Sequence, residues 1–162
     1  MGAHLRRATD GMRTRGARAF FLALVTTFAV GFGSATRAAD TAALTAFARA
    51  AGLAQIDAFI ETVQAIDRTS RLPERYLTKA RAQALGWRPG DDLCRVAPGK
   101  AIGGDHFGNR EGRLPARAGR RYQEADLDFA CGRRGAKRLV FSNDGLRFVT
   151  TDHYESFREV PK

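Results

Sequence analysis

The chain has 162 residues, of which 44% are hydrophobic, 9% aromatic and 27% charged. This composition excludes disordered, collagen-like and low-complexity proteins and suits one globular domain. Lys and Arg together number 27 against 17 Asp and Glu, a net charge of +10, so the expected partners are polyanions: nucleic acid, an acidic protein or an anionic membrane. Two cysteines are too few for a disulfide scaffold or a four-cysteine zinc site.

The N-terminal residues have the features of an export signal. Five arginines precede an uncharged apolar run over residues 19–30, and the small residues Gly33 and Ala35 follow. We expect a signal peptide over residues 1–35, with cleavage as late as residue 39, because signal peptidases require small residues before the cut. The alternative is an uncleaved anchor, but the run is shorter than the roughly 20 residues that span a bilayer.

Cleavage removes five arginines and one acid, which leaves a net charge of +6. We therefore expect a basic mature protein without membrane attachment, secreted or retained in the periplasm, where cysteines are oxidised.

Residues 40–70 predict an N-terminal helical segment. Apolar residues recur every three or four positions from Leu53 to Ile66, the spacing of one face of an amphipathic helix, and we expect this face to pack in the core. Gly52 precedes this helix, and a proline at position 73 follows it. Further helices are predicted over residues 41–51, 78–85 and 91–96.

After Lys100, glycine, asparagine and proline separate short runs, a pattern typical of loops between strands. Residues 122–129 alternate between two faces, with Ala125 on the core face and Glu124 on the open face. Residues 138–152 predict a hairpin with an Asn-Asp-Gly turn at its tip. N-terminal helices packed on a C-terminal antiparallel sheet give an α+β fold.

The sequence contains no metal or cofactor motif. The three histidines are isolated, without His-x-x-x-His or a Cys/His cluster, so we expect no metal and no cofactor. Phosphodiester cleavage without a metal needs a base, an acid and cations for the phosphate, and RNA supplies its own nucleophile, the 2′-hydroxyl. Glu124, His153, Arg134 and Arg138 are suitable residue types, although each alone is more often structural.

Four stretches of the chain carry a more specific signal. They are LPERYLTKARAQALGW (72–87), VAPGKAIGGDHFGNREGRLP (96–115), GRRYQEADLDF (119–129) and TTDHYESF (150–157). In this order and spacing they resemble the barnase family of guanyl-preferring microbial ribonucleases. The resemblance implies a ribonuclease domain over residues 72–160 with the microbial ribonuclease fold. The helix over residues 41–51 is not part of the family pattern.

The resemblance implies catalytic roles for five residues. Glu124 matches the general base that deprotonates the 2′-hydroxyl, and His153 matches the general acid that protonates the 5′ leaving oxygen. Lys79 matches a lysine that stabilises charge on the transferring phosphate, and Arg134 and Arg138 match two phosphate-contacting arginines. The implied product is a 2′,3′-cyclic phosphate, which is then hydrolysed slowly with the two proton-transfer roles exchanged.

The implied guanine site is a loop beginning at Phe107. Family loops donate backbone amides to guanine O6, and Glu111 matches the glutamate that accepts from N1 and N2, a pattern that mismatches adenine. The chain departs from the family at Gly108, where serine is common, and at Arg133, where an aromatic residue is common. The expected substrate-binding residues are Phe107, Gly108, Asn109, Arg110, Glu111 and Tyr154.

Neighbouring residues are expected to have supporting roles. The family pattern brings two segments close together and thereby implies a Cys94–Cys131 disulfide. We further expect Asp126 to hold Arg134 or Arg138, Asp152 to orient the turn at His153, and Asp105, His106 and Arg120 to be loop residues.

The implied partners are RNA and a small acidic barstar-like inhibitor protein, and we expect a monomer. The charge leaves one alternative function open. A non-catalytic exported protein that binds RNA or another polyanion would also use a basic surface.

Overall fold

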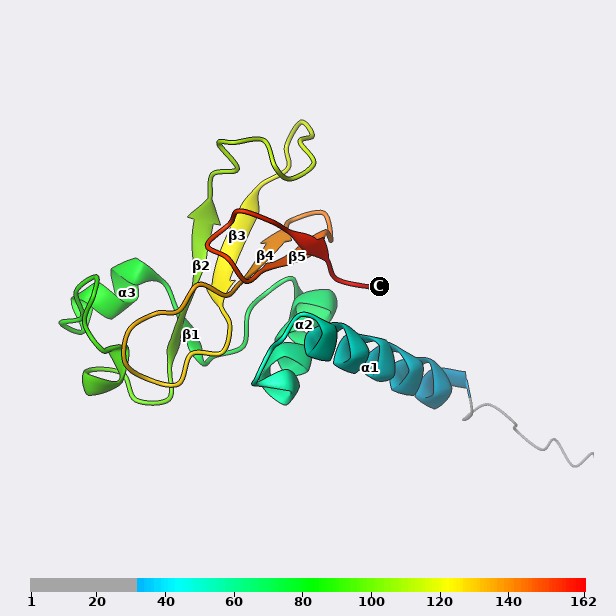
Figure 1. Ribbon diagram of the computed structural model, residues 1–162, viewed down its shortest axis with the longest axis horizontal. Coiled ribbons are helices and arrows are strands. Elements are labelled where there is room, and N and C mark those ends of the chain that lie inside the picture. The colour runs from blue at the N-terminus through cyan, green and yellow to red at the C-terminus, as the bar shows by residue number, and fades with distance from the viewer. Residues whose placement is uncertain (1–31) are drawn as a thin grey trace, which may run out of the picture.

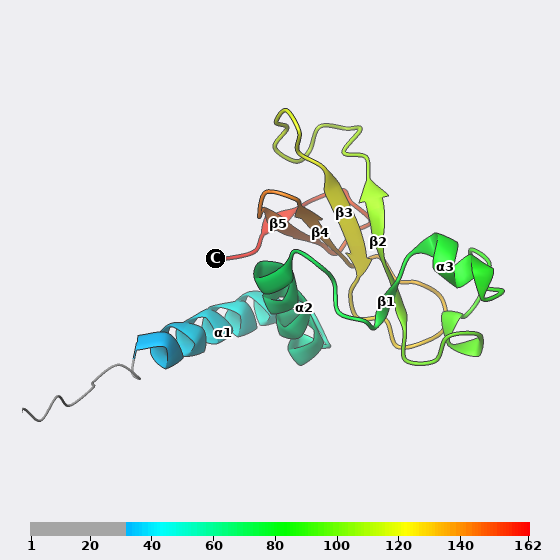
Figure 2. The same ribbon diagram turned by 180° about the vertical axis from the view of Figure 1, so that it is seen from behind.

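The structure, a computed structural model, describes residues 32–162. Six strands form one sheet, with α1 and α2 side by side and α3 at the opposite end of the molecule (Figures 1 and 2). The helices are α1 (Phe32–Ala50), α2 (Ile56–Thr69), α3 (Lys79–Ala84) and the 3-10 turn η1 (Leu93–Arg95). The strands are β1 (Tyr76–Leu77), β2 (Ala101–Phe107), β3 (Tyr122–Asp126), β4 (Arg138–Ser142), β5 (Arg147–Thr150) and β6 (Arg158–Glu159).

The strands follow one another across the sheet in chain order. Every pair from β2 to β6 is antiparallel, including the predicted hairpin of β4 and β5. The predicted α+β fold, with N-terminal helices on a C-terminal sheet, is confirmed. One detail differs. β1 pairs with β2 in parallel, so the sheet is mixed. The sequence does not predict β1, because a strand of two residues is too short to produce an alternation pattern.

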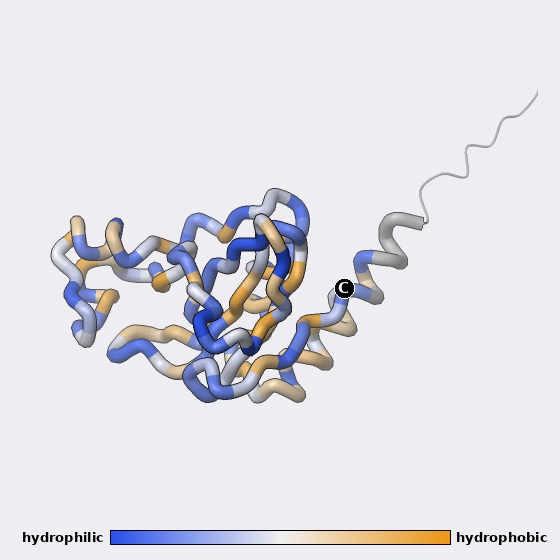
Figure 3. Tube along the Cα trace, turned by 90° about the horizontal axis from the view of Figure 1, so that it is seen from above, coloured by the Kyte–Doolittle hydropathy of each residue, from blue (hydrophilic) through white to orange (hydrophobic). Residues whose placement is uncertain are grey.

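α1 and α2 cover one face of the sheet and share a hydrophobic core with it. The apolar face of α2 is buried, as predicted. Apolar stretches of chain gather among the central strands and along the helices in Figure 3. From the helical segment the core contains Leu44, Ala48, Leu53, Phe59, Ile60, Val63 and Ile66, and from the sheet side Leu127, Leu139, Phe141, Val149 and Val160.

α1 begins at Phe32, earlier than the predicted start at residue 41. The predicted signal peptide therefore lies outside the described residues except for its last four, and cleavage between residues 35 and 39 would fall within α1. Phe47 stacks on Phe59 of α2 at 5.9 Å and lies 5.4 Å from the guanidinium of Arg158. This additional helix thus packs on the domain. Over residues 32–162, no helix has the length and apolar character needed to cross a membrane.

β2 was not predicted, because two adjacent glycines interrupt it. A β-carbon at Gly103 would lie 2.7 Å from a ring carbon of Tyr76 and 3.0 Å from the β-carbon of Ala125. Gly104 has a φ of +91° and lies where the β2–β3 register shifts. The glycines therefore form a bulge inside a strand and do not mark a loop. His106, expected in a loop, is an exposed residue of β2.

β3 ends at Asp126 and not at residue 129 as predicted. Asp128 leaves the strand with a φ of +54°, and its carboxylate accepts hydrogen bonds from the backbone amides of Ala54 and Gln55 just before α2. Lys137 pairs with the same carboxylate at 2.7 Å. Asp128 therefore fixes the start of the loop between β3 and β4.

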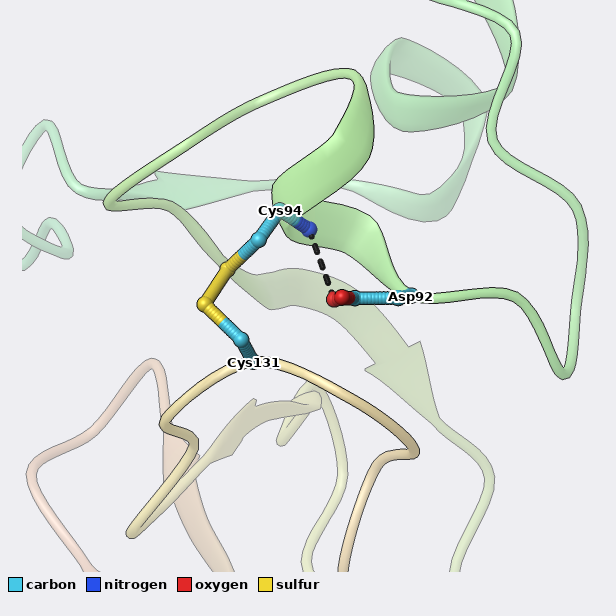
Figure 4. A group of neighbouring side chains, drawn as sticks. All are labelled: Asp92, Cys94 and Cys131. Carbon is cyan, nitrogen blue, oxygen red and sulfur yellow. Dashed lines mark hydrogen bonds between the residues drawn. A yellow bond between two sulfur atoms is a disulfide. The ribbon is translucent and has the colours of Figure 1, made fainter.

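The middle of the same loop is held by the predicted Cys94–Cys131 disulfide, which is confirmed. Figure 4 shows Asp92 beside it, where the Asp92 carboxylate accepts from the Cys94 amide at 2.9 Å. The same carboxylate also accepts from the Gly132 amide at 2.8 Å. The predicted helix over residues 91–96 is only the turn η1, capped by Asp92. Beneath it, α3 and the buried Trp87 form a second small core.

Replacing both cysteines by alanine is expected to lower the free energy of unfolding by about 3–4 kcal/mol. The bridge joins residues 37 positions apart, and a loop of that length gives this value in the chain-entropy model. Urea unfolding of the double variant and of the wild type, each with and without a thiol reductant, measures the difference. Reductant should destabilise only the wild type. Equal free energies of unfolding for the wild type and the variant without reductant would contradict the expectation.

Candidate active site

The candidate site lies on the face of the sheet opposite α1 and α2. Glu124 comes from β3 and Arg138 from β4, while Arg134 comes from the loop between them. Lys79 is the first residue of α3, where Thr78 caps the helix by accepting from the Arg81 amide. The segment after β5 crosses this face, as the red chain in Figure 1 shows.

Glu124 is only 6% exposed, so the expectation that it lies on an open face is wrong. Its Oε1 is 2.6 Å from Nζ of Lys79, and its Oε2 accepts a hydrogen bond from the Tyr154 hydroxyl. These side chains reach the strand from α3 and from the segment after β5, which strand alternation alone could not indicate. Burial and two polar partners therefore fix the orientation of the carboxylate.

The environment of Glu124 favours its ionised form. Burial by itself raises the pKa of this carboxyl, but the hydrogen bonds from Lys79 and Tyr154 outweigh burial and leave the pKa below its usual range. The environment of the Tyr154 phenol favours its neutral form, because burial and the neighbouring Glu124 carboxylate raise the pKa of Tyr154 to about 12. Near neutral pH the site thus holds a carboxylate ready to accept a proton beside a neutral phenol.

Replacing Lys79 by methionine should move the acidic limb of the kcat/KM profile to higher pH. Without the ammonium, one fewer hydrogen bond opposes the effect of burial, so the pKa of Glu124 rises. In the role of general base that the resemblance implies, Glu124 acts only at pH values above its pKa. The measurement is kcat/KM from pH 3 to 9 for the RNA cleavage that the resemblance implies. Arg81→Gln removes one positive charge from the exposed side of the same helix and should leave the limb in place; an unmoved limb in Lys79→Met would contradict the account.

Asp126 organises the two arginines. Arg134 donates both Nε and Nη2 to its carboxylate at 2.7 Å, and Nε of Arg138 lies 3.0 Å from Oδ1. We expected Asp126 to hold Arg134 or Arg138, and it pairs with both. Arg138 is 4% exposed and also donates to the carbonyls of Gly135 and Lys137. The two guanidinium groups are thus fixed beside β3 before any ligand binds.

His153 lies in a tight turn directly after β5. His153 and Tyr154 both have positive φ, +57° and +74°. The Asp152 carboxylate accepts from the Thr150 hydroxyl at 2.8 Å and from both the amide and the hydroxyl of Ser156. These hydrogen bonds lower the pKa of Asp152 to about 2. Asp152 therefore holds the turn that carries the histidine, as expected.

A cleft of about 590 Å³ separates the His153 turn from the loop after β2. Its walls include the five predicted loop residues 107–111 together with His153 and Tyr154. Asn109, with a φ of +42°, exchanges hydrogen bonds with the backbone of Leu114 at 2.9 and 3.0 Å. Phe107 packs on Tyr154 with ring centroids 5.3 Å apart. The predicted base-binding loop thus has a fixed shape and faces the histidine.

The predicted site residues form two adjoining groups. Residues 107–111 and His153 line the cleft, whereas Lys79, Glu124, Arg134 and Arg138 are not among its lining residues. Tyr154 joins the groups, because it lines the cleft while its hydroxyl donates to Glu124 and its ring centroid lies 6.0 Å from the Arg138 guanidinium. Sequence reasoning assigned Tyr154 only to nucleotide packing, and no pattern indicates the bond to Glu124.

Two anchoring residues also take clearer roles. Asp105 lies on β2, not in a loop, and accepts from the Lys79 amide at 2.9 Å, so it fixes the start of α3. Arg120 pairs with Asp144 at 2.7 Å and donates to the Pro115 carbonyl at 2.8 Å, which anchors its loop. Arg113 was missed: it contacts both walls of the cleft, and its position within the matched loop motif was the available signal.

Among the described residues, one trio has the spacing of potential metal ligands: Asp92, Cys94 and Cys131. Both sulfurs are committed to the disulfide in Figure 4, and metals bind cysteine as a free thiolate. The donor set therefore does not fit a metal ion.

Comparison of the chain with known proteins identifies ribonucleases. A family model described as ribonuclease matches residues 61–161. A ribonuclease of Bacillus intermedius is 50% identical over 109 residues, 67% of this chain and 67% of that protein. A ribonuclease of Heyndrickxia coagulans is 49% identical over 108 residues, 66% of this chain and 99% of that protein. Guanyl-specific ribonuclease St of Saccharopolyspora erythraea is 48% identical over 56 residues, 34% of this chain and 55% of that protein.

The fold, the arrangement of ionisable side chains and these similarities define the class of protein, a microbial ribonuclease. The chain belongs to the barnase-like ribonuclease family, as its four motifs predict.

Proposed function

We propose that the chain is an exported, guanyl-preferring endoribonuclease that cleaves single-stranded RNA by transphosphorylation. The observation that carries this proposal is the position of Tyr154, which lines the cleft beside His153 and also binds the ionised Glu124. Tyr154 thereby links the proposed proton acceptor, Glu124, to the cleft that the proposed proton donor, His153, lines. Neither role requires a metal ion, because the substrate supplies the attacking hydroxyl.

In the proposed reaction Glu124 accepts the proton of the 2′-hydroxyl as its oxygen attacks the adjacent phosphorus. Lys79, Arg134 and Arg138 stabilise the negative charge that develops on the phosphate oxygens. His153, protonated at the start, gives its proton to the departing 5′ oxygen. The product is a 2′,3′-cyclic phosphate. Water then opens the ring, with His153 as the base and Glu124 as the acid.

The preference for guanine follows from the chemistry of the loop over residues 107–111. Backbone amides can donate to guanine O6, and the Glu111 carboxylate can accept from N1 and N2, whereas adenine lacks O6 and carries no proton at N1. Gly108 retains its amide, and a β-carbon there would meet the Arg110 side chain only at 3.5 Å, so the loop shape does not depend on glycine. One similar protein is named a guanyl-specific ribonuclease.

The proposal includes export and partners. The disulfide and the predicted signal peptide support an oxidising compartment outside the cytoplasm. We propose a monomer whose basic active-site face also accepts a small acidic inhibitor protein, because the cations that hold phosphate would equally attract carboxylates.

The test is digestion of a defined RNA by the purified chain in EDTA, with analysis of the product ends. We expect cleavage 3′ to guanosine, with 2′,3′-cyclic phosphate ends appearing before 3′-phosphates. A matched strand with 2′-deoxyguanosine at each guanosine should resist cleavage, because it lacks the nucleophile. Cleavage of that strand, or cleavage only with added metal, would contradict the mechanism. Binding without cleavage would favour the alternative, a basic RNA-binding protein.

A further inference from the structure

Arg113 contacts both walls of the cleft. Its Nη1 donates to the carbonyl of Tyr154 at 2.9 Å and to the carbonyl of Glu155. Its Nε lies 3.1 Å from Oε2 of Glu111. One guanidinium group therefore connects the carboxylate that is expected to read the base with the backbone that follows His153.

Each wall has its own internal bonds, and Arg113 adds a connection between them. The loop after β2 is closed by the hydrogen bonds between Asn109 and Leu114, and the histidine turn is closed by Asp152. Glu111 is different, because its side chain is 70% exposed and has many rotamers available to it. The ion pair with Arg113 restricts that freedom.

The contact leaves Glu111 able to bind a base. An ionised carboxylate has two oxygens and about four acceptor positions, and Arg113 engages Oε2. Two proton donors on one edge of guanine can therefore still be accepted. Arg113 lines the same cleft, and its side chain is 42% exposed, so it is accessible from the space where a base would bind.

We infer that Arg113 is a positioning residue that sets base specificity and couples base binding to the general acid. This inference rests on the proposed guanyl-preferring activity. A guanine held by Glu111 fixes the Arg113 guanidinium, and that guanidinium fixes the backbone carbonyls next to His153. A base other than guanine does not offer Glu111 the N1 and N2 protons. Arg113 is then not fixed by the bound base, so only guanine stabilises the position of the backbone next to His153.

The geometry requires arginine in particular. A planar guanidinium presents several N–H groups in fixed directions and can bond to two carbonyls and a carboxylate at once, whereas lysine carries one compact charge. Arg113→Lys should therefore retain the charge near the cleft and lose most of the coupling.

The experiment compares kcat and KM for guanylyl-3′,5′-cytidine and adenylyl-3′,5′-cytidine. In Arg113→Ala we expect kcat/KM for the guanine substrate to fall about tenfold, the loss typical of one charge-assisted hydrogen bond. KM should rise and kcat should fall together. The adenine substrate should change less than twofold, so the preference for guanine decreases. Arg113→Lys should resemble Arg113→Ala.

Arg117→Ala is the matched control. It also removes one arginine charge, from a side chain that is 74% exposed and pairs only distantly with Asp144, at 3.8 Å. It should leave the preference unchanged. Equal losses on both substrates in Arg113→Ala, or full activity in Arg113→Lys, would overturn the inference. A wild type that cleaves both substrates equally would instead refute the guanyl preference itself. The unfolding midpoint of each variant, measured beside that of the wild type, separates a kinetic change from a loss of folded protein.

Discussion

Replacing His153 by asparagine should reduce kcat/KM for RNA by about 10²–10⁴, the usual contribution of a positioned general acid. Asparagine is the appropriate replacement because His153 has a φ of +57°, and asparagine adopts this left-handed region more readily than most residues. The turn held by Asp152 should therefore keep its shape. Initial rates on guanylyl-3′,5′-cytidine measure the loss.

A substrate with a nitrophenolate leaving group separates acid catalysis from other effects of the substitution. Nitrophenolate departs without a proton, so a guanosine 3′-nitrophenyl phosphodiester does not need the general acid. His153→Asn should cleave this substrate within about tenfold of the wild type, a residual loss of at most about 1.4 kcal/mol. An equal loss on both substrates would show that His153 does not donate the proton to the leaving group.

Replacing Glu124 by glutamine should give a loss of similar size, about 10²–10⁴ in kcat/KM, but on both substrates. Glutamine has nearly the same shape and can still accept from Tyr154, yet it cannot take a proton. The nitrophenyl substrate still requires deprotonation of the 2′-hydroxyl, so its better leaving group does not replace the base. The same rate assays on the two substrates measure this pattern.

Glu159→Gln is a matched control for that variant, since Glu159 is an exposed glutamate of β6 at the far edge of the sheet. It should retain wild-type rates on both substrates. If Glu124→Gln recovered its rate on the nitrophenyl substrate as His153→Asn does, Glu124 would not be the base.

The helical part of the fold follows from sequence periodicity. The stripe from Leu53 to Ile66 packs in the core as predicted, with Ile56 half-buried at its edge, and the Asn-Asp-Gly turn connects β4 and β5. Tertiary contacts determine what periodicity missed. Gly103 belongs to β2 because Tyr76 and Ala125 press against it, and β3 ends early because Asp128 turns to bind the backbone before α2.

The site was predictable in composition but not in arrangement. The motifs identify Glu124, Lys79 and Tyr154, while their hydrogen bonds join elements 30 and 45 positions apart. Short-range patterns contain no information on such distant contacts, so Glu124 was expected on an open face. Arg113 was missed for the same reason, since its partners Tyr154 and Glu155 lie 41 and 42 positions away.

The central question is whether Glu124 and His153 act on opposite sides of one phosphodiester. A crystal structure of the chain with 2′-O-methyl-guanylyl-3′,5′-cytidine, which cannot be cleaved, answers it directly. We expect guanine against residues 107–111, a Glu124 oxygen within about 3.5 Å of the 2′ oxygen, and a His153 ring nitrogen within about 3.2 Å of the 5′ oxygen. A dinucleotide bound with its phosphate away from either side chain would contradict the account.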